Sequence, residues 1–219
     1  LMTGASPGNR RPLTSRNSAW AAQLASWAVA RDITPNQISQ ASIGFAVIGF
    51  ALYAMSTQVG GLAQFLGLLL AAATLQARLV CNLIDGMVAI EGGKGAQDGP
   101  FWNEAPDRVS DFLFFAGAGL AAGQPDLGLF AAALAIATAY VRELGRAEGF
   151  PPDFSGPLAK PQRMAVLTAG TVIASLFASE WTLTVTLWVV VAGTAATVIR
   201  RSLTLIGNLV FILRVSSYW

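Results

Sequence analysis

Long apolar runs alternate with short polar stretches along the whole chain. Six of these runs approach the roughly 20 mostly apolar residues that a helix needs to cross a lipid bilayer. They cover residues 37–56, 63–89, 107–122, 127–148, 163–179 and 182–199. Since no long polar region interrupts them, the pattern predicts an all-α membrane protein with six transmembrane helices.

Two further segments have helical spacing outside the six runs. Residues 17–33 place Trp20 and Trp27 among apolar neighbours three or four positions apart, which predicts an amphipathic helix in the membrane interface. Such a helix could be a plain anchor or could take part in lipid entry. Residues 202–215 could form another interfacial or packing helix. The predicted organisation is a polar tail over 1–16 and one integral membrane domain over 17–219.

Basic residues gather on one side of the predicted bundle. The turns at 56–61, 121–126 and 179–181 contain no Lys or Arg. The opposite loops and the termini contain Arg10, Arg11, Arg16, Arg31, Lys94, Arg146, Lys160, Arg163, Arg200, Arg201 and Arg214. By the positive-inside rule, both termini and the loop between the second and third spans are expected on the cytoplasmic side, in a bacterial inner membrane.

Composition narrows the chemistry. Of the 219 residues, 54% are hydrophobic and 12% are charged, against about 25% charged in soluble domains. The chain has no His and a single Cys. His-dependent catalysis, His-ligated zinc and multi-cysteine metal sites are therefore excluded. Acid–base or metal chemistry has to come from carboxylates, amides, Lys or Arg.

A group of acidic residues flanks the loop between the second and third spans. At 100° per residue, Arg78, Asn82 and Asp85 share one face of the second helix, and Asp107 and Asp111 lie one turn apart on the third. Carboxylates this close repel one another in a medium of low dielectric unless a cation neutralises them. Oxygen-only ligands favour Mg²⁺ or Mn²⁺, which commonly share their shell with substrate phosphates.

Two other interpretations of the acidic residues stay open. They could cap helix ends and pair with Arg78 and Arg108, or they could belong to a transporter. Transporters place carboxylates near the membrane midplane, often at broken helices. Here the acids gather at one edge, and the first, fifth and sixth spans have none in their middles. The pattern favours metal-assisted phosphoryl transfer.

The same residues resemble the CDP-alcohol phosphotransferase family, whose signature is D-x-x-D-G-x-x-A-R, a short loop, then G-x-x-x-D-x-x-x-D. Asp85, Gly86 and Ala89 match the D-G-x-x-A part, and Asp107 and Asp111 match the final D-x-x-x-D. The segment "ITPNQIS", from residue 33 to 39, is similar to the one that precedes the first span in this family.

The sequence departs from the signature at three positions, and its loop is longer. Asn82 stands at the first Asp, Ile90 at the Arg, and Asn103 at the second Gly. The chain therefore resembles a divergent member with weaker metal affinity at Asn82. The diphosphate contact of the missing Arg could come from Arg78, Lys94 or Arg108.

The resemblance implies transfer of a substituted phosphate from a CDP-linked donor, most commonly CDP-diacylglycerol, to an alcohol, with release of CMP, in phospholipid biosynthesis. It implies a metal site with two ions, Mg²⁺ or Mn²⁺, held by Asn82, Asp85, Asp107 and Asp111. Asp111 would also be the catalytic base. The CDP moiety would contact Thr34, Pro35, Asn36, Gly86 and Ala89. A homodimer is common in the family, and no nucleic-acid partner is expected.

Four basic residues at the predicted cytoplasmic ends of the fourth and fifth spans are candidates for the acceptor. If Arg142, Arg146, Lys160 and Arg163 converge on the site, the acceptor is a phosphorylated alcohol such as glycerol 3-phosphate or inositol phosphate. They could equally follow the positive-inside rule and touch lipid headgroups. Arg142 could instead be structural, paired with Glu143.

Three functions are consistent with these residues. An active transferase predicts metal-dependent release of CMP. A catalytically weakened lipid- or nucleotide-binding homologue, which Asn82 and Ile90 favour, predicts CDP binding without turnover. A transporter, which the position of the acids disfavours, predicts flux across vesicles without CMP.

Overall fold

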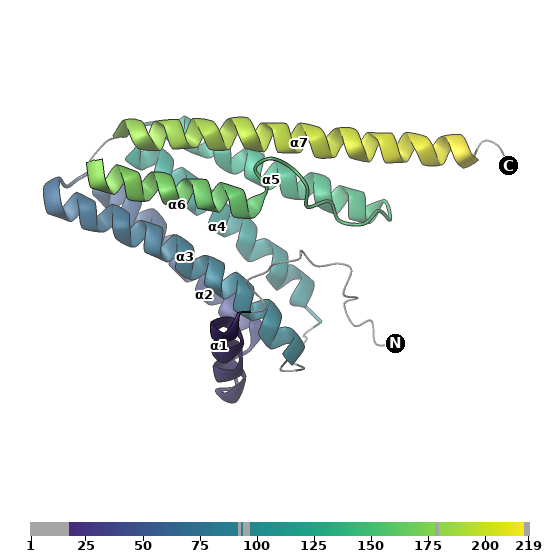
Figure 1. The fold of residues 1–219 in the computed structure, drawn as a ribbon, viewed down its shortest axis with the longest axis horizontal. Helices are drawn as coiled ribbons and strands as arrows, with labels where there is room; N and C mark the ends of the chain where they lie inside the picture. Colours follow the sequence, from purple (N-terminus) through teal and green to yellow (C-terminus); the bar gives the residue numbers. More distant parts are fainter. Residues whose placement is uncertain (1–17, 92, 94–96, 178–179, 217–219) are drawn as a thin grey trace.

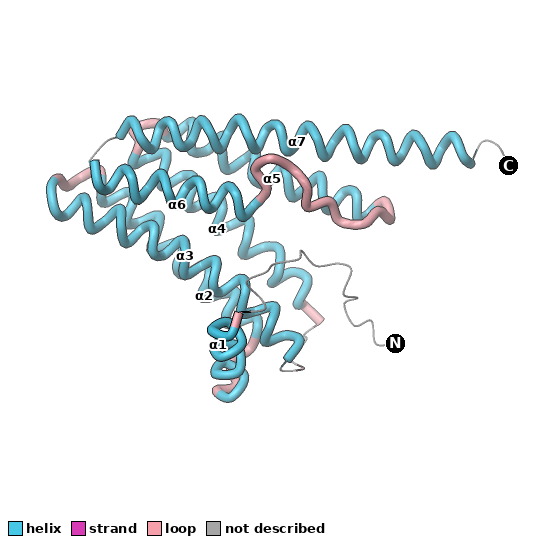
Figure 2. Tube along the Cα trace, in the orientation of Figure 1, coloured by secondary structure: helices cyan, strands magenta, loops and turns pink. Residues whose placement is uncertain are grey.

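The computed structural model describes residues 18–91, 93, 97–177 and 180–216. Within these ranges the chain forms seven helices and no strand (Figures 1 and 2). The predicted tail over 1–16 lies outside the described residues. The helices are α1 (Ala19–Ala30), α2 (Pro35–Ser56), α3 (Gly61–Glu91), α4 (Gly99–Ala121), α5 (Pro125–Ala147), α6 (Lys160–Phe177) and α7 (Glu180–Ser216).

Six of the helices close into a ring. Going round it, α3 packs on α2, α2 on α4, α4 on α5, α5 on α7, α7 on α6, and α6 back on α3. Large buried side chains fill the interior, among them Tyr53, Phe114, Phe115 and Leu187. Helix α1 lies outside the ring and packs against α3 (Figure 1). The ring brings α3, α4 and α6 together although they are far apart in the sequence.

The start of α2 is fixed by local chemistry. The backbone N–H of Gln37 donates to the Thr34 hydroxyl at 3.2 Å, and the Thr34 N–H donates to the Gln37 side chain at 2.9 Å. Pro35 follows as the first helical residue, where its missing N–H costs nothing. This capping box fixes where α2 begins, one turn before Ser39.

The predicted helix at 202–215 is not a separate element. It is continuous with the sixth predicted span, because α7 runs unbroken over 37 residues through Arg200 and Arg201. Arginine is a good helix former, and no Pro follows to end the helix there. At 1.5 Å per residue the helix is roughly 55 Å long, well beyond the ~30 Å of a hydrocarbon core. Figure 1 shows its C-terminal part extending past the other helices.

Four helices, α2, α3, α5 and α7, are long and apolar enough to cross a membrane. Helices α4 and α6 coincide with the other two predicted spans but contain the charged residues described below. In α1, Ala21, Ala25 and Ala28 are buried, whereas Trp20 and Trp27 are each 49% exposed. The small residues of α1 thus pack on the protein, and the two Trp side chains face outward. The interfacial position of α1 stays a prediction.

Helices α4 and α5 approach each other at two glycines. A Cβ added at Gly128 would lie 2.5 Å from the carbonyl oxygen of Phe115 and 2.7 Å from the Cα of Gly119. Both atoms belong to the backbone of α4, so neither can move aside without shifting the helix.

Replacing Gly128 by Ala is therefore expected to destabilise the fold by about 1–3 kcal/mol through overpacking. The matched control is Gly44→Ala in α2, where the added Cβ meets nothing within 4 Å and the better helix former should be neutral or stabilising. Unfolding of both variants in mixed detergent micelles would be followed by circular dichroism. Equal stability of the two variants would show that α4 and α5 do not touch there.

Candidate active site at the junction of α3, α4 and α6

The acidic residues singled out in the sequence meet inside the ring. Asp85 lies on α3, and Asp107 and Asp111 lie one turn apart on α4. Their exposed fractions are only 8%, 7% and 1%. The amide nitrogen of Asn82, one turn before Asp85, donates to Asp107 Oδ1 at 2.6 Å, which joins the two helices directly. The predicted convergence of these side chains is thus present in the structure.

Cationic side chains of the chain itself engage all four oxygens of Asp107 and Asp111. Arg78 Nη2 lies 2.9 Å from Asp107 Oδ1 and 3.3 Å from Asp111 Oδ1. Arg163 Nη2 lies 3.3 Å from Asp111 Oδ2. Lys160 forms an ion pair with Asp107 Oδ2. Arg108 Nη2 also lies 3.7 Å from Asp107 Oδ2. Pairing with Arg78 and Arg108, which the sequence left open as an alternative, therefore occurs, and α6 contributes two more cations.

Asp85 has a different environment. Its Oδ2 accepts a hydrogen bond from the Ser39 hydroxyl at 2.9 Å, and within the described residues it forms no ion pair. Ser39 is 3% exposed and lies one turn after the start of α2. Of the three carboxylates, Asp85 is therefore the one whose charge the neighbouring side chains leave unpaired.

The side chains around the aspartates differ from the predicted metal site. Carboxylate and amide oxygens are the ligands that Mg²⁺ and Mn²⁺ prefer. In the described part of the chain, however, no group of three or more His, Cys, Asp or Glu side chains is placed to hold a metal ion, and Lys and Arg already engage Asp107 and Asp111. The side chains as they stand do not fit two divalent cations. The assignment of Asn82, Asp85, Asp107 and Asp111 as ligands stays a prediction.

Only two of the four candidate acceptor residues contact the aspartates. Lys160 and Arg163 do so, as described above. Arg142 instead lies 2.5 Å from Glu104 and 2.8 Å from Glu143. Arg146 lies 2.9 Å from Glu143. These contacts agree with the structural role that the sequence left open for Arg142, paired with Glu143.

Lys160 precedes the predicted fifth span. Its side chain is 22% exposed, whereas those of Arg78 and Arg163 are 0% and 2% exposed. Of the three cations, Lys160 therefore has the most access to an entering molecule.

The candidate CDP residues begin α2 and follow Asp85 on α3. Thr34 and Pro35 form the helix start described above, and the side chain of Asn36 donates to Asp98 Oδ1 at 3.1 Å. Trp102 also donates to Asp98, at 2.9 Å. Gly86 and Ala89 lie within α3. Ile90, which stands at the Arg of the signature, is 64% exposed. Lys94 lies outside the described residues.

Sequence reasoning missed Ser39 and Arg201. Ser39 lies three residues after Asn36 on α2, but packing against α3 decides which face of α2 is buried, and no sequence signal pointed to Ser39. Arg201 had been counted only as a loop cation. It is 5% exposed, and its Nη1 donates to the Thr138 carbonyl at 2.8 Å and its Nε to the Ser155 carbonyl at 2.9 Å. It thereby ties the loop at 148–159 to α5 and α7, next to Arg163.

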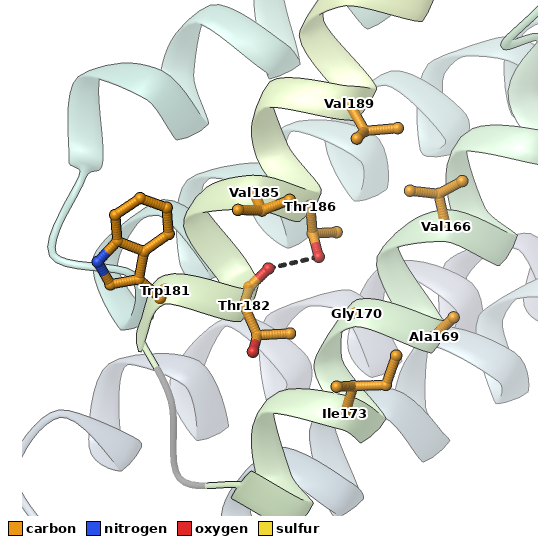
Figure 3. Close-up of a pocket in the computed structure, with 9 residues that line it drawn as sticks. All are labelled: Val166, Ala169, Gly170, Ile173, Trp181, Thr182, Val185, Thr186 and Val189. Carbon is orange, nitrogen blue, oxygen red and sulfur yellow. Dashed lines mark hydrogen bonds between the residues drawn. The ribbon is translucent and has the colours of Figure 1, made fainter.

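A separate groove of about 540 Å³ opens between α6 and α7. Figure 3 shows its lining, in which the Thr186 hydroxyl donates to the Thr182 carbonyl at 2.7 Å. The remaining lining is Val166, Ala169, Gly170, Ile173, Trp181, Val185 and Val189. Since these side chains carry no charge, the groove suits acyl chains rather than chemistry.

Comparison with known proteins supports the resemblance seen in the motif. The chain is 26% identical over 191 residues to the phosphatidylinositol phosphate synthase of Mycolicibacterium smegmatis, covering 81% of this chain and 80% of that protein. No family model matches. The chain is similar to the CDP-alcohol phosphotransferases. The prediction made from Asp85, Gly86, Ala89, Asp107 and Asp111 is confirmed at this level.

Solved structures share the fold. The phosphatidylinositol phosphate synthase of Mycobacterium tuberculosis with CDP-DAG bound gives a TM-score of 0.73 at 19% identity, covering 86% of this chain and 94% of that one. The same synthase in complex with manganese and citrate gives 0.72 at 19% identity, covering 84% and 88%. At this level of identity the likeness establishes the fold, and the ligands belong to the other protein.

Ser39 offers a direct test of how Asp85 is held. Replacing Ser39 by Ala removes a hydrogen bond to a charged group and is expected to cost about 1.5–3 kcal/mol of folding stability. The control is Ser42→Ala, one turn later on the same helix, because the Ser42 hydroxyl is also buried but donates only to the Ser39 carbonyl. Denaturant titration in detergent would compare the two, and an equal loss would remove Ser39 as the support of Asp85.

Proposed function

We propose that the chain transfers a phosphatidyl group from CDP-diacylglycerol to a phosphorylated alcohol and releases CMP. The observation that carries the proposal is the contact of Lys160 and Arg163 with Asp107 and Asp111, which places phosphate-binding cations beside the candidate base. The names of the relatives support it, since a phosphatidylinositol phosphate synthase makes a lipid that contains such an alcohol. Inositol phosphate is thus the first acceptor to try.

The chemistry asked of these residues is modest. The acceptor hydroxyl oxygen attacks the phosphatidyl phosphorus, and the bond from that phosphorus to the CMP oxygen breaks. The hydroxyl proton passes to the carboxylate of Asp111, which must lie within hydrogen-bond reach of it. Lys160 and Arg163 hold the acceptor phosphate and thereby orient the hydroxyl. Because Asp111 is 1% exposed, the acceptor has to take a place now filled by those cations.

The donor nucleotide is assigned to the start of α2 and the adjoining part of α3. Thr34, Pro35 and Asn36 would border the cytidine, and Gly86 and Ala89 would let the α3 backbone come close to it. Asp85, held by Ser39 at 2.9 Å, lies between this region and the aspartates of α4. Mg²⁺ or Mn²⁺ is the proposed cofactor, supported by the oxygen donors and by the manganese in the related synthase.

The membrane arrangement is proposed from the sequence pattern. All six ring helices would cross a bacterial inner membrane, with α1 in the interface and with both termini and the site on the cytoplasmic side. Helices α4 and α6 can carry charge within the membrane because the ring shields it from lipid. Residues 17–219 would form one domain, and the chain is expected to form a homodimer.

A catalytically weakened nucleotide-binding homologue is the second candidate. Two observations favour it: Asn82 stands at a predicted metal-ligand position, and cations of the chain occupy Asp107 and Asp111. Such a protein would bind CDP and release no CMP.

The assay that separates the two candidates uses purified protein with CDP-diacylglycerol, Mn²⁺ or Mg²⁺ and a panel of alcohols and alcohol phosphates. Wild-type protein is expected to form CMP and a new phospholipid, detected by mass spectrometry. Asp111→Asn is expected to form neither, since it lacks the base, while retaining CDP binding as proof of folding. Undiminished CMP release by Asp111→Asn would exclude Asp111 as the base.

The acceptor assignment has its own test. Lys160→Met is expected to raise KM for the phosphorylated alcohol by about tenfold or more, since a charge-assisted contact is lost. KM for CDP-diacylglycerol should change little. Arg200→Met removes an exposed cation of α7 and serves as control for net charge. An equal effect of the two variants on the acceptor KM would mean that Lys160 acts only through general charge.

A further inference from the structure

Arg78 is the least expected residue of the site. Its side chain is fully buried, with 0% exposed, one helical turn before Asn82 on α3. A buried guanidinium keeps its charge, so its desolvation must be offset by partners. Arg78 Nη2 has three within reach: Asp107 Oδ1 at 2.9 Å, Asp111 Oδ1 at 3.3 Å and the Asp107 carbonyl at 3.4 Å.

Two other nitrogens of the same guanidinium have no partner in the described part of the chain. Its Nε–H and Nη1–H groups are buried and donate to no side chain or carbonyl among the residues that the structure describes. Buried donors without a partner are rare in folded proteins, because each costs free energy to desolvate. The Nε–H and Nη1–H groups point from different edges of the guanidinium, so each can donate to a separate oxygen of a diphosphate.

The charges of the site already balance without a metal ion. Asp85, Asp107 and Asp111 carry three negative charges, and Arg78, Lys160 and Arg163 carry three positive ones. Arg108, 3.7 Å from Asp107 Oδ2, is matched by Glu104 at 3.2 Å and leaves the balance unchanged. Two divalent ions would add four positive charges to a neutral, buried group, where Coulomb energies are large. One ion beside Asp85, together with the two or more negative charges of a nucleoside diphosphate, would leave the group near balance.

The residue at position 82 is consistent with this balance of charges. Its amide nitrogen donates to Asp107 Oδ1 at 2.6 Å, the same oxygen that Arg78 contacts. A carboxylate at position 82 would put negative charge against that oxygen and require a further cation. Asn82 and Arg78 together shift the charge of this face of α3 by two relative to an Asp and a neutral residue.

We infer that Arg78 takes the place of one divalent cation. Its guanidinium neutralises Asp107 and Asp111, and its Nε–H and Nη1–H groups bind the diphosphate of a CDP-linked substrate. The site then holds no more than one divalent ion, at Asp85. The inference rests on the proposed function for the identity of the diphosphate. It adds a fixed, protein-borne cation and a lower metal stoichiometry.

The test counts ions directly. Mn²⁺ would be titrated into purified protein with saturating CDP, and bound Mn²⁺ would be measured from the loss of the free-ion electron paramagnetic resonance signal. Wild type is expected to bind no more than one Mn²⁺ per chain. The double variant Arg78→Met, Asn82→Asp is expected to bind one more than wild type. Two ions in wild type, or equal stoichiometry in both proteins, would overturn the inference.

A conservative variant protects the test against misfolding. Arg78→Lys keeps the charge but loses the Nε–H and Nη1–H donors. Its Mn²⁺ stoichiometry should therefore stay as in wild type, while CDP affinity, measured by calorimetry, falls about tenfold or more. Arg31→Lys, at the exposed residue that follows α1, is the matched control. Unchanged CDP affinity in Arg78→Lys contradicts the diphosphate contact. If wild type binds no CDP, the proposed function fails, and the Mn²⁺ count still decides whether Arg78 replaces an ion.

Discussion

The structure depends on the neutralisation of two buried carboxylates. Asp107 and Asp111 project from α4 into a region with almost no solvent, and cations from α3 and α6 meet them there. Removing one partner of such a group leaves an uncompensated charge, which typically costs several kcal/mol. The same ion pairs therefore tie three helices together and assemble the candidate site, so that the geometry of the site and the closure of the ring cannot be varied independently.

This constraint accounts for the division of labour among the helices. Helices α2, α3, α5 and α7 are apolar enough to face lipid, whereas α4 and α6 carry Asp107, Asp111, Lys160 and Arg163. A membrane helix can hold such residues only where other protein covers them. In the ring, α4 packs between α2 and α5, and α6 packs between α3 and α7. Helix α3 also carries Arg78 and Asp85, which are buried like both aspartates of α4. The polar chemistry thus resides on side chains that neighbouring helices cover.

Sequence patterns predicted the parts of this arrangement that depend on one helix at a time. The apolar runs located the helices, and the spacing of Asp107 and Asp111 placed them on one face. The division of residues 182–215 into two segments failed because Arg200 and Arg201 resembled a loop, while a basic pair does not end a helix. Ser39 and the burial of Arg78 could not be foreseen, since both depend on how α2, α3 and α6 are rotated against one another. For the same reason, the sequence could not show that Lys160 contacts the aspartates and Arg146 does not.

The departures from the family signature become interpretable when they are taken together with their neighbours in space. Taken alone, Asn82 indicates a lost metal ligand and a weakened protein. In the structure, Asn82 and Arg78 both contact the same oxygen of Asp107. Asn82 brings no negative charge that a metal ion would have to neutralise, and Arg78 supplies positive charge to Asp107. A change that removes a negative charge and a nearby guanidinium that adds a positive one act in the same direction. They describe a site whose electrostatics have moved from bound ions toward fixed side chains, and a fixed guanidinium can still stabilise a phosphate.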